Sequence, residues 1–275
     1  MKRLFAFLLC LVMVLSLLPA CGSGEGSANT TGKPAPTESP EEAEVLKIMI
    51  LGSSRSINTF QMLWNAFKDQ MPDQKVVLGV MYYSGCSISE HVEFVKNNEP
   101  AYTYYYNDSG RWVTTDNTAM DVGLADQAWD VVFLQAGDGD TANNMNEAGR
   151  KYLTEYVDKI VETPHTFWWH STWFNSTTPE LFKPEKTKLN PYTIDQYGQL
   201  TSGIDAAKAY VFDDPMFAGH ITSGTPMMYA LKILEVPEVD LYRDHTHLSD
   251  FGCLLVGYAW YAQYTGKPVT QVGID

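Results

Sequence analysis

The sequence predicts an α/β fold with a mostly parallel β-sheet, because short apolar runs alternate with segments of helical spacing. Four apolar runs are expected to be strands: 45–51, 75–80, 129–137 and 165–170. Apolar residues recur at helical spacing in three further segments: 60–67, 88–96 and 145–160. Strands that alternate with helices form a parallel sheet covered by helices on both faces.

The ends of the first two expected strands coincide with turn residues. The first strand is followed by Gly52-Ser53-Ser54 and the second by a turn at Ser84-Gly85. In an open parallel sheet, the loops at the carboxyl ends of the strands meet at one edge, where ligands bind. We therefore expect the loops 52–56, 82–87 and 135–140 to line one edge of the sheet.

Two segments depart from this alternation. Residues 101–115, "AYTYYYNDSGRWVTT", are rich in strand-forming residues and have Asn107-Asp108-Ser109-Gly110 at their centre, which predicts an inserted β-hairpin. The last segment, 251–266, has helical spacing and is too short and too interrupted by glycine to span a membrane, so we expect a core helix. Its expected buried face consists of Phe251, Leu254, Leu255, Tyr258 and Ala262.

The first 44 residues have the composition of an export signal and a linker. Lys2 and Arg3 precede an apolar run at 4–18, which is typical of a secretory signal over residues 1–20. The run is shorter than the ~20 residues of a membrane span, so an anchor helix is the weaker alternative. Residues 21–44 are rich in Gly, Ser, Thr, Pro and Glu and predict a flexible linker, which leaves 45–275 as one domain.

The end of this signal resembles the lipobox of bacterial lipoproteins. Cys21 follows a small residue, Ala20, and Leu18 stands three positions before it. The resemblance implies that Cys21 becomes the lipidated N-terminus and anchors the domain to the bacterial cell membrane on its outer, extracytoplasmic side. An ordinary cleaved signal is the alternative.

Charge and cysteine content exclude several classes of function. The formal net charge is −14, which argues against nucleic acid and against a polybasic membrane patch. Of four cysteines, only Cys86 and Cys253 fall within the expected domain, and export would permit a disulfide between them. Cys86 lies in a turn and is an alternative nucleophile, although a small buried apolar residue is the simpler interpretation.

Three residues suggest nucleophilic catalysis by a serine hydroxyl. Ser54 stands where a strand passes into a helix, so its hydroxyl can be exposed beside the backbone N–H groups of the helix N-terminus. Asp244 precedes His247 by three residues, a spacing that lets the carboxylate accept a hydrogen bond from Nδ1 and leaves Nε2 as a base. Ser54, His247 and Asp244 therefore form a candidate catalytic triad.

The motifs around these residues resemble the SGNH (GDSL-like) esterase and lipase family, over nearly the whole domain. "ILGSSRSIN" (50–58) resembles its first block, "YYSGCSISEH" (82–91) the second and "WDVVFLQAGDGD" (129–140) the third; 244–247 resembles the fifth, with its D-x-x-H pair. The resemblance implies a three-layer α/β/α sandwich with a flavodoxin-like, mostly parallel sheet. It also implies that Ser54 is the nucleophile and that the Gly85 N–H donates to the oxyanion.

Two positions differ from the family pattern. Ser53 stands where the first block has Asp or Asn. The third block has an oxyanion-binding Asn, whereas this chain has Gly137-Asp138-Gly139-Asp140. We consider Gln135 as the replacement donor. Loss of one oxyanion donor costs about 10²–10³ in rate, so catalytic activity depends on this replacement.

These observations favour an exported, lipid-anchored serine esterase that removes O-acyl groups from a carbohydrate or a small molecule, without metal or organic cofactor. The alternative is a surface lipoprotein of the same fold that binds glycans without turnover. A third possibility, a metal site at His245 and His247, lacks a further histidine at recognisable spacing. Eight aromatic residues could stack on sugar rings and would serve either of the first two functions, although packing in the hairpin and the core is the simpler interpretation: Tyr102, Tyr104, Tyr105, Tyr106, Trp168, Trp169, Trp173 and Phe174.

Overall fold

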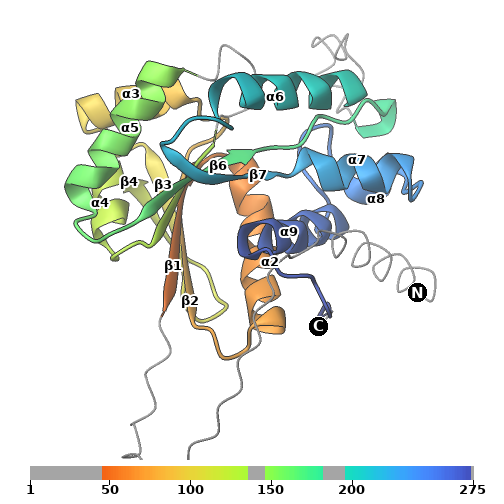
Figure 1. The fold of residues 1–275 in the computed structure, drawn as a ribbon, viewed down its shortest axis with the longest axis horizontal. Helices are drawn as coiled ribbons and strands as arrows, with labels where there is room; N and C mark the ends of the chain where they lie inside the picture. Colours follow the sequence, from red (N-terminus) through yellow and green to blue (C-terminus); the bar gives the residue numbers. More distant parts are fainter. Residues whose placement is uncertain (1–44, 136–145, 182–195, 274–275) are drawn as a thin grey trace, which may run out of the picture.

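A computed structural model describes residues 45–135, 146–181 and 196–273. Within them lies one seven-stranded sheet in the order β4-β3-β2-β1-β5-β6-β7 (Figure 1). The strands are β1 Leu46–Gly52, β2 Val76–Tyr82, β3 Tyr102–Asn107, β4 Val113–Thr118, β5 Val131–Gln135, β6 Thr166–Ser171 and β7 Phe217–Thr222. Neighbouring strands pair in parallel along β2-β1-β5-β6-β7. Strand β3 pairs antiparallel with β2, and β4 pairs antiparallel with β3.

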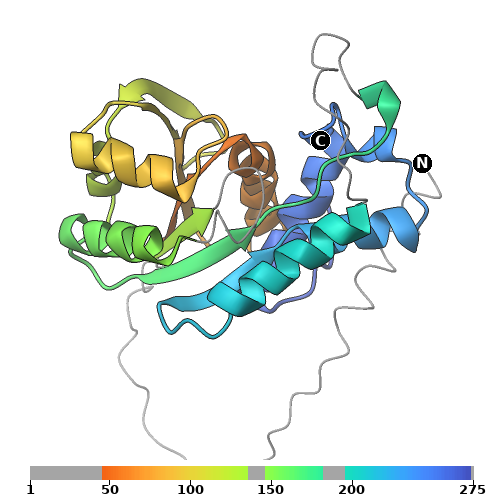
Figure 2. The same ribbon diagram turned by 90° about the horizontal axis from the view of Figure 1, so that it is seen from above.

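Helices cover both faces of this sheet, as Figure 1 and Figure 2 show. The α-helices are α2 Ser54–Gln70, α3 Ile88–Asn97, α4 Met120–Ala125, α5 Glu147–Ile160, α6 Gln196–Tyr210, α7 Gly224–Lys232, α8 Glu238–Leu241 and α9 Asp250–Thr265; η1, Pro179–Leu181, is a short 3₁₀ helix. None of the helices in the described ranges is both long and apolar enough to cross a membrane. The expected α/β/α sandwich with a mostly parallel sheet is confirmed.

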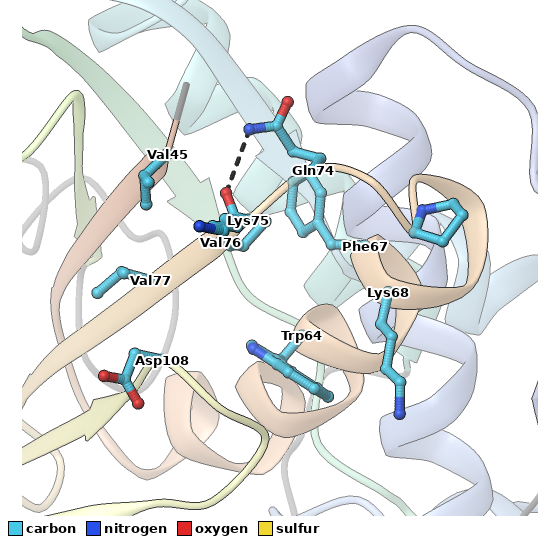
Figure 3. Close-up of a pocket in the computed structure, with 10 residues that line it drawn as sticks. Val45, Trp64, Phe67, Lys68, Gln74, Lys75, Val76, Val77 and Asp108 are labelled. Carbon is cyan, nitrogen blue, oxygen red and sulfur yellow. Dashed lines mark hydrogen bonds between the residues drawn. The ribbon is translucent and has the colours of Figure 1, made fainter. Parts of the chain in front are cut away.

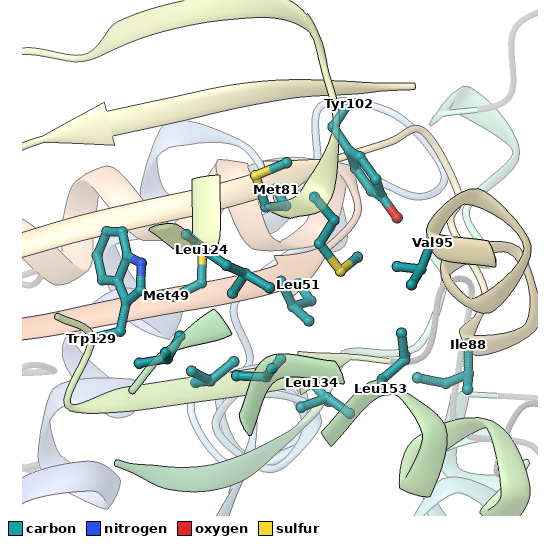
Figure 4. Packing of buried hydrophobic residues seen from close by; sticks show 14 of the residues in the cluster. Met49, Leu51, Met81, Ile88, Val95, Tyr102, Leu124, Trp129, Leu134 and Leu153 are labelled. Carbon is teal, nitrogen blue, oxygen red and sulfur yellow. The ribbon is translucent and has the colours of Figure 1, made fainter. Parts of the chain in front are cut away.

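The alternation of side chains along β1 divides the core into two layers. Ile48 and Ile50 point to one face and pack with residues of α2 and α9, such as Phe60 and Trp260. Met49 and Leu51 point to the other face, where α3, α4, α5 and α6 cover them (Figure 4). Both faces of the central strand are therefore buried, which explains its continuous apolar sequence.

The predicted hairpin is present and extends the sheet at one edge. Strand β3 pairs antiparallel with β2 and β4 in turn pairs with β3. The Asn107 side chain stabilises the turn, because its oxygen accepts hydrogen bonds from the N–H groups of Ser109 and Gly110 at 3.3 and 2.7 Å. Gly110 has a φ of 90°, a backbone conformation that favours glycine.

The last helix lies in the core as expected, but two residues of its expected buried face are less buried than predicted. Phe251 and Leu254 are only half-buried, whereas Cys253, Val256 and Trp260 on other faces are buried. The helix is enclosed on several sides because α2, α7, α8 and β7 all pack against it. The N-cap is Ser249, whose side chain accepts from the Gly252 N–H, and Asp250 is the first residue of the helix.

Candidate active site

Ser54 lies at the carboxyl edge of the sheet, at the first residue of α2. Strand β1 ends at Gly52 between β2 on one side and β5 on the other, so the chain switches direction across the sheet here. Ser53 is the N-cap of α2, and its side chain accepts from the Arg55 N–H. The nucleophile candidate therefore stands at a helix N-terminus, whose partial positive charge favours a developing oxyanion.

The structure brings the three candidate triad residues together. The Ser54 Oγ lies 3.0 Å from His247 Nε2, across 193 positions of sequence. On the other side of the ring, His247 Nδ1 lies 2.9 Å from one carboxylate oxygen of Asp244 and 3.1 Å from the other. These distances allow a proton to pass from the serine to the imidazole while the carboxylate fixes the ring.

Asp244 is held as a carboxylate by its own loop. Burial acts to raise its pKa, but hydrogen bonds from the N–H groups of His247 and Thr246, at 2.8 and 2.9 Å, together with the His247 ring, lower the pKa to about 2. At neutral pH the side chain is therefore a charged acceptor, which keeps the proton of the His247 ring on Nδ1 and leaves Nε2 to face Ser54.

Gly85 lies in the turn between β2 and α3, beside the nucleophile turn. The Tyr83 N–H donates to the carbonyl of Gly52 at 3.3 Å, which ties the turn after β2 to the end of β1. Gly85 has a φ of 66°, in the left-handed region that glycine adopts without strain. The role of its N–H as an oxyanion donor stays a prediction.

Gln135 ends β5 and is fully buried behind the nucleophile turn. Its Oε1 accepts from the Ser53 N–H at 3.1 Å and from the Ser56 hydroxyl, so the side chain holds both sides of Ser54. Its Nε2 has no hydrogen-bond partner in the described ranges. Donation from this atom to an oxyanion stays a prediction.

Gly137 to Asp140, which depart from the family pattern, lie outside the described residues.

Neither cysteine supports the alternative chemistry. Cys86 and Cys253 are both free and buried, so they do not form a disulfide. Burial strongly raises the pKa of the Cys86 thiol and raises that of Cys253 to about 12. The interpretation of Cys86 as a nucleophile is therefore wrong, since the thiolate is the reactive form.

Two other histidines, His91 and His170, form hydrogen bonds inside the fold. His91 Nδ1 lies 2.8 Å from the Tyr102 hydroxyl, and His170 Nε2 lies 2.9 Å from the Ser223 hydroxyl. Across the residues that the structure describes, no group of three or more His, Cys, Asp or Glu side chains could hold a metal ion.

Packing within the fold, the simpler interpretation, is confirmed for most of the eight aromatic residues, and a sugar platform is wrong for these. Tyr102, Tyr104, Trp169, Trp173 and Phe174 are buried, so their faces cannot stack on a sugar. Tyr102, Tyr104 and Trp169 belong to the packed cluster on the sheet face covered by α3 to α6, and Trp173 and Phe174 pack in a cluster with Tyr242 and Leu248.

The segment 172–178, which connects β6 to η1, was missed by sequence reasoning. It contacts the loop of Asp244 and His247 as well as Arg55, the residue after the nucleophile. A signal was available, because the rule that places the loops after β1, β2 and β5 at one edge also applies to the loop after β6.

A pocket of about 470 Å³ lies away from these residues (Figure 3). Its lining residues come from the starts of β1 and β2 and from the second half of α2. It therefore lies at the opposite edge of the sheet from Ser54. Trp64, Lys68 and Asp108 are among its lining residues.

The sheet order and the helix layers agree with the fold of the SGNH (GDSL-like) proteins, and Ser54, His247 and Asp244 lie together at the carboxyl edge of its sheet. A protein described as a GDSL-like lipase from Parabacteroides merdae has a similar structure, with a TM-score of 0.51 at 10% identity over 82% of this chain and 99% of that chain. At this identity the similarity concerns the fold alone.

The chain belongs to the family described as "Domain of unknown function (DUF4886)", whose model matches residues 47–274. The crystal structure of a member of this family from Bacteroides uniformis is also similar, with a TM-score of 0.70 at 22% identity, covering 84% of this chain and 87% of that chain. No curated protein matched the chain.

Proposed function

We propose that this protein is a serine esterase. The observation that carries the proposal is the continuous hydrogen-bonded path from Ser54 Oγ through the His247 ring to the Asp244 carboxylate. A serine hydroxyl is a weak nucleophile by itself, and an imidazole in contact with it, oriented by a carboxylate, activates it for attack on an acyl carbon.

In the proposed reaction, Ser54 Oγ attacks the ester carbonyl carbon while His247 Nε2 takes the serine proton. The N–H groups of Ser54 and Gly85 donate to the oxyanion of the tetrahedral intermediate. The carbon–oxygen ester bond then breaks, and the leaving alcohol takes its proton from His247. Water, deprotonated by His247, then attacks the acyl carbon. The bond between this carbon and Ser54 Oγ breaks, Oγ takes the proton back from His247, and the carboxylic acid leaves.

We also propose that the substrate is an O-acyl group on a carbohydrate and that lipid on Cys21 anchors the domain outside the cell. The export signal and the Gly-, Pro- and Glu-rich segment before the domain support this arrangement, since a tethered enzyme meets polymers at the surface. Metabolic labelling with an alkynyl fatty acid tests the anchor. Cys21→Ala should abolish labelling; undiminished labelling would contradict it.

The enzymatic proposal is tested with short acyl esters, acetylated oligosaccharides and a fluorophosphonate probe. We expect wild type to be labelled and to hydrolyse esters, and Ser54→Ala to lose labelling and at least about 10³-fold in kcat/KM. Ser109→Ala, in the exposed hairpin turn, is the matched control and should behave as wild type. Equal reactivity of wild type and Ser54→Ala would refute the proposal. Hydrolysis of aryl acetates without hydrolysis of acetylated sugars would refute the carbohydrate substrate only.

A further inference from the structure

The segment that connects β6 to η1, residues 172–178, holds the loop that carries the acid and the base. The Trp173 Nε1–H donates to the carbonyl of Thr246 at 2.8 Å, and the Ser176 N–H donates to the carbonyl of His245 at 2.8 Å. The peptide unit between Thr246 and His247 is therefore fixed from both ends, because its N–H, that of His247, donates to Asp244 Oδ1 at 2.8 Å.

The same segment also contacts the nucleophile side of the site. Arg55 follows Ser54 directly, and its Nη1 donates to the carbonyl of Trp173 while its Nη2 donates to Asn175 Oδ1 at 2.7 Å. The guanidinium group lies over the Trp173 ring, 5.4 Å from the ring centre. Arg55 and Trp173 are 1% and 2% exposed, so these contacts are closed to water, which would otherwise compete for them.

Trp173 is the residue at which both sets of contacts meet. Its carbonyl and its ring face the residue after the nucleophile, and its indole N–H faces the residue before the base. The contacts thus form a closed circuit from Ser54 through Arg55, Trp173 and Thr246 to Asp244, His247 and back to Ser54.

We propose that Trp173 is a positioning residue that sets the separation of Ser54 Oγ and His247 Nε2. The inference rests on the proposed esterase function. A catalytic group has to be held within about 0.5 Å of its productive position, and a displacement of about 1 Å costs on the order of 10²-fold in rate. Loss of the indole N–H frees the Thr246 carbonyl and, through that peptide unit, the Asp244 carboxylate.

A purely structural role would have a different signature. Trp173 packs in a buried cluster with Leu241, Tyr242 and Leu248, so any truncation lowers the stability of the fold. A structural residue changes the amount of folded protein but leaves kcat per folded molecule unchanged. A positioning residue lowers kcat and leaves KM near its wild-type value, because substrate binding does not require the Ser54–His247 contact.

Trp129 supplies a matched control. It is also fully buried, its Nε1–H donates to a backbone carbonyl, that of Gly123, at 3.1 Å, and it packs on the face of the sheet covered by α3 to α6. Phenylalanine at either position keeps an aromatic ring and removes the N–H donor. Substitution at 173 with 3-benzothienylalanine keeps the shape of indole as well, which covers the case in which Trp173→Phe does not fold.

We expect Trp173→Phe to lower kcat about 10- to 100-fold with KM within about twofold, and Trp129→Phe to lose stability with kcat unchanged. Hydrogen exchange of peptides that span 243–248 is measured in parallel, and it should be faster only in the Trp173 variants. Unchanged exchange in this peptide, or equal kcat losses at 173 and 129, would overturn the proposal. Because exchange needs no substrate, an inactive wild type would refute the esterase function while the exchange result still tests the positioning.

Discussion

The nucleophile turn and the acid–base loop, which meet at the Ser54–His247 contact, are held in different ways. The nucleophile turn, 52–54, is a continuation of the central strand, and its residue Ser53 is 1% exposed. The acid–base loop, 243–247, lies off the sheet, with the side chains of His247 and Asp244 28% and 22% exposed. The backbone topology of the fold positions the serine, whereas individual hydrogen bonds position the base.

The nucleophile turn and the acid–base loop should respond differently to single substitutions. The turn shares its geometry with β1 and α2, so large displacement of Ser54 requires disruption of the core. The loop is closed by a single backbone bridge, Tyr242 to Leu248, and by hydrogen bonds to the segment 172–178. Single substitutions should therefore uncouple catalysis from stability more readily in the loop than in the turn.

The largest effect is expected at Asp244, because its carboxylate both orients His247 and organises the loop. Asp244→Asn should lower kcat about 10³- to 10⁴-fold, since the amide neither fixes the ring tautomer nor stabilises the imidazolium. Ester hydrolysis under single-turnover conditions measures this loss. Asp240→Asn, an exposed position on α8, is the control and should keep wild-type kcat. Retention of more than a tenth of the activity in Asp244→Asn would remove Asp244 from the triad.

The same substitution has a pH-dependent effect on stability. The pKa of Asp244 is lowered in the folded state to about 2 from its ordinary 3.8, so the charged form stabilises the fold above about pH 4. This contribution, about 2 kcal/mol, is lost as the pH falls towards 2. The difference in unfolding free energy between wild type and Asp244→Asn should shrink from pH 5 to pH 2, as measured by urea unfolding. A difference that stays constant would contradict the role of the charge.

The contrast between the two regions also explains what the sequence could predict. Ser54 is found because a strand end followed by a helix start leaves a pattern of apolar residues, glycine and serine. Asp244 and His247 are found by their three-residue spacing. The contacts of 172–178 with the acid–base loop leave no such pattern, because in the loop they end on the backbone carbonyls of His245 and Thr246, which every residue has.

The parts of the fold that were not predicted have weak hydrophobic patterns. Strand β7 lies at the sheet edge, and only Ile221 among its six residues is buried, so it has no apolar run. Helix α6 buries only Gln196 and Ala207 and has no clear apolar stripe. Both elements depend on tertiary contacts, β7 on its pairing with β6 and α6 on its packing against α7.

Substitution of Gln135 tests how the nucleophile turn is held, and its expected effect on kcat is intermediate in size. Gln135→Met removes the acceptor of the Ser53 N–H and Ser56 hydroxyl and should cost about 1–3 kcal/mol of stability and about tenfold or more in kcat. Ser56→Ala removes only one donor to that acceptor. If Gln135 acts by holding the turn, Ser56→Ala reproduces part of the kcat loss. If Gln135 donates to the oxyanion, Gln135→Met loses about 10²–10³-fold and Ser56→Ala keeps kcat. Steady-state kinetics of both variants separates the two roles.

The smallest effect is expected where the acid–base loop passes into α9. Ser249→Ala removes the acceptor of the Gly252 N–H and the donor to the Asp240 carbonyl, and should cost about 1–2 kcal/mol in thermal unfolding. Asp250→Asn removes only a charge from the first turn of the helix, worth about 0.3–1 kcal/mol. Both variants should keep kcat within about twofold, because neither removes the hydrogen bonds to the loop of His247 that come from 172–178, from Asp244 and from the Arg243 N–H. A large kcat loss in Ser249→Ala would mean that the helix start, and therefore the core, positions the base, and the distinction between the two regions would no longer hold.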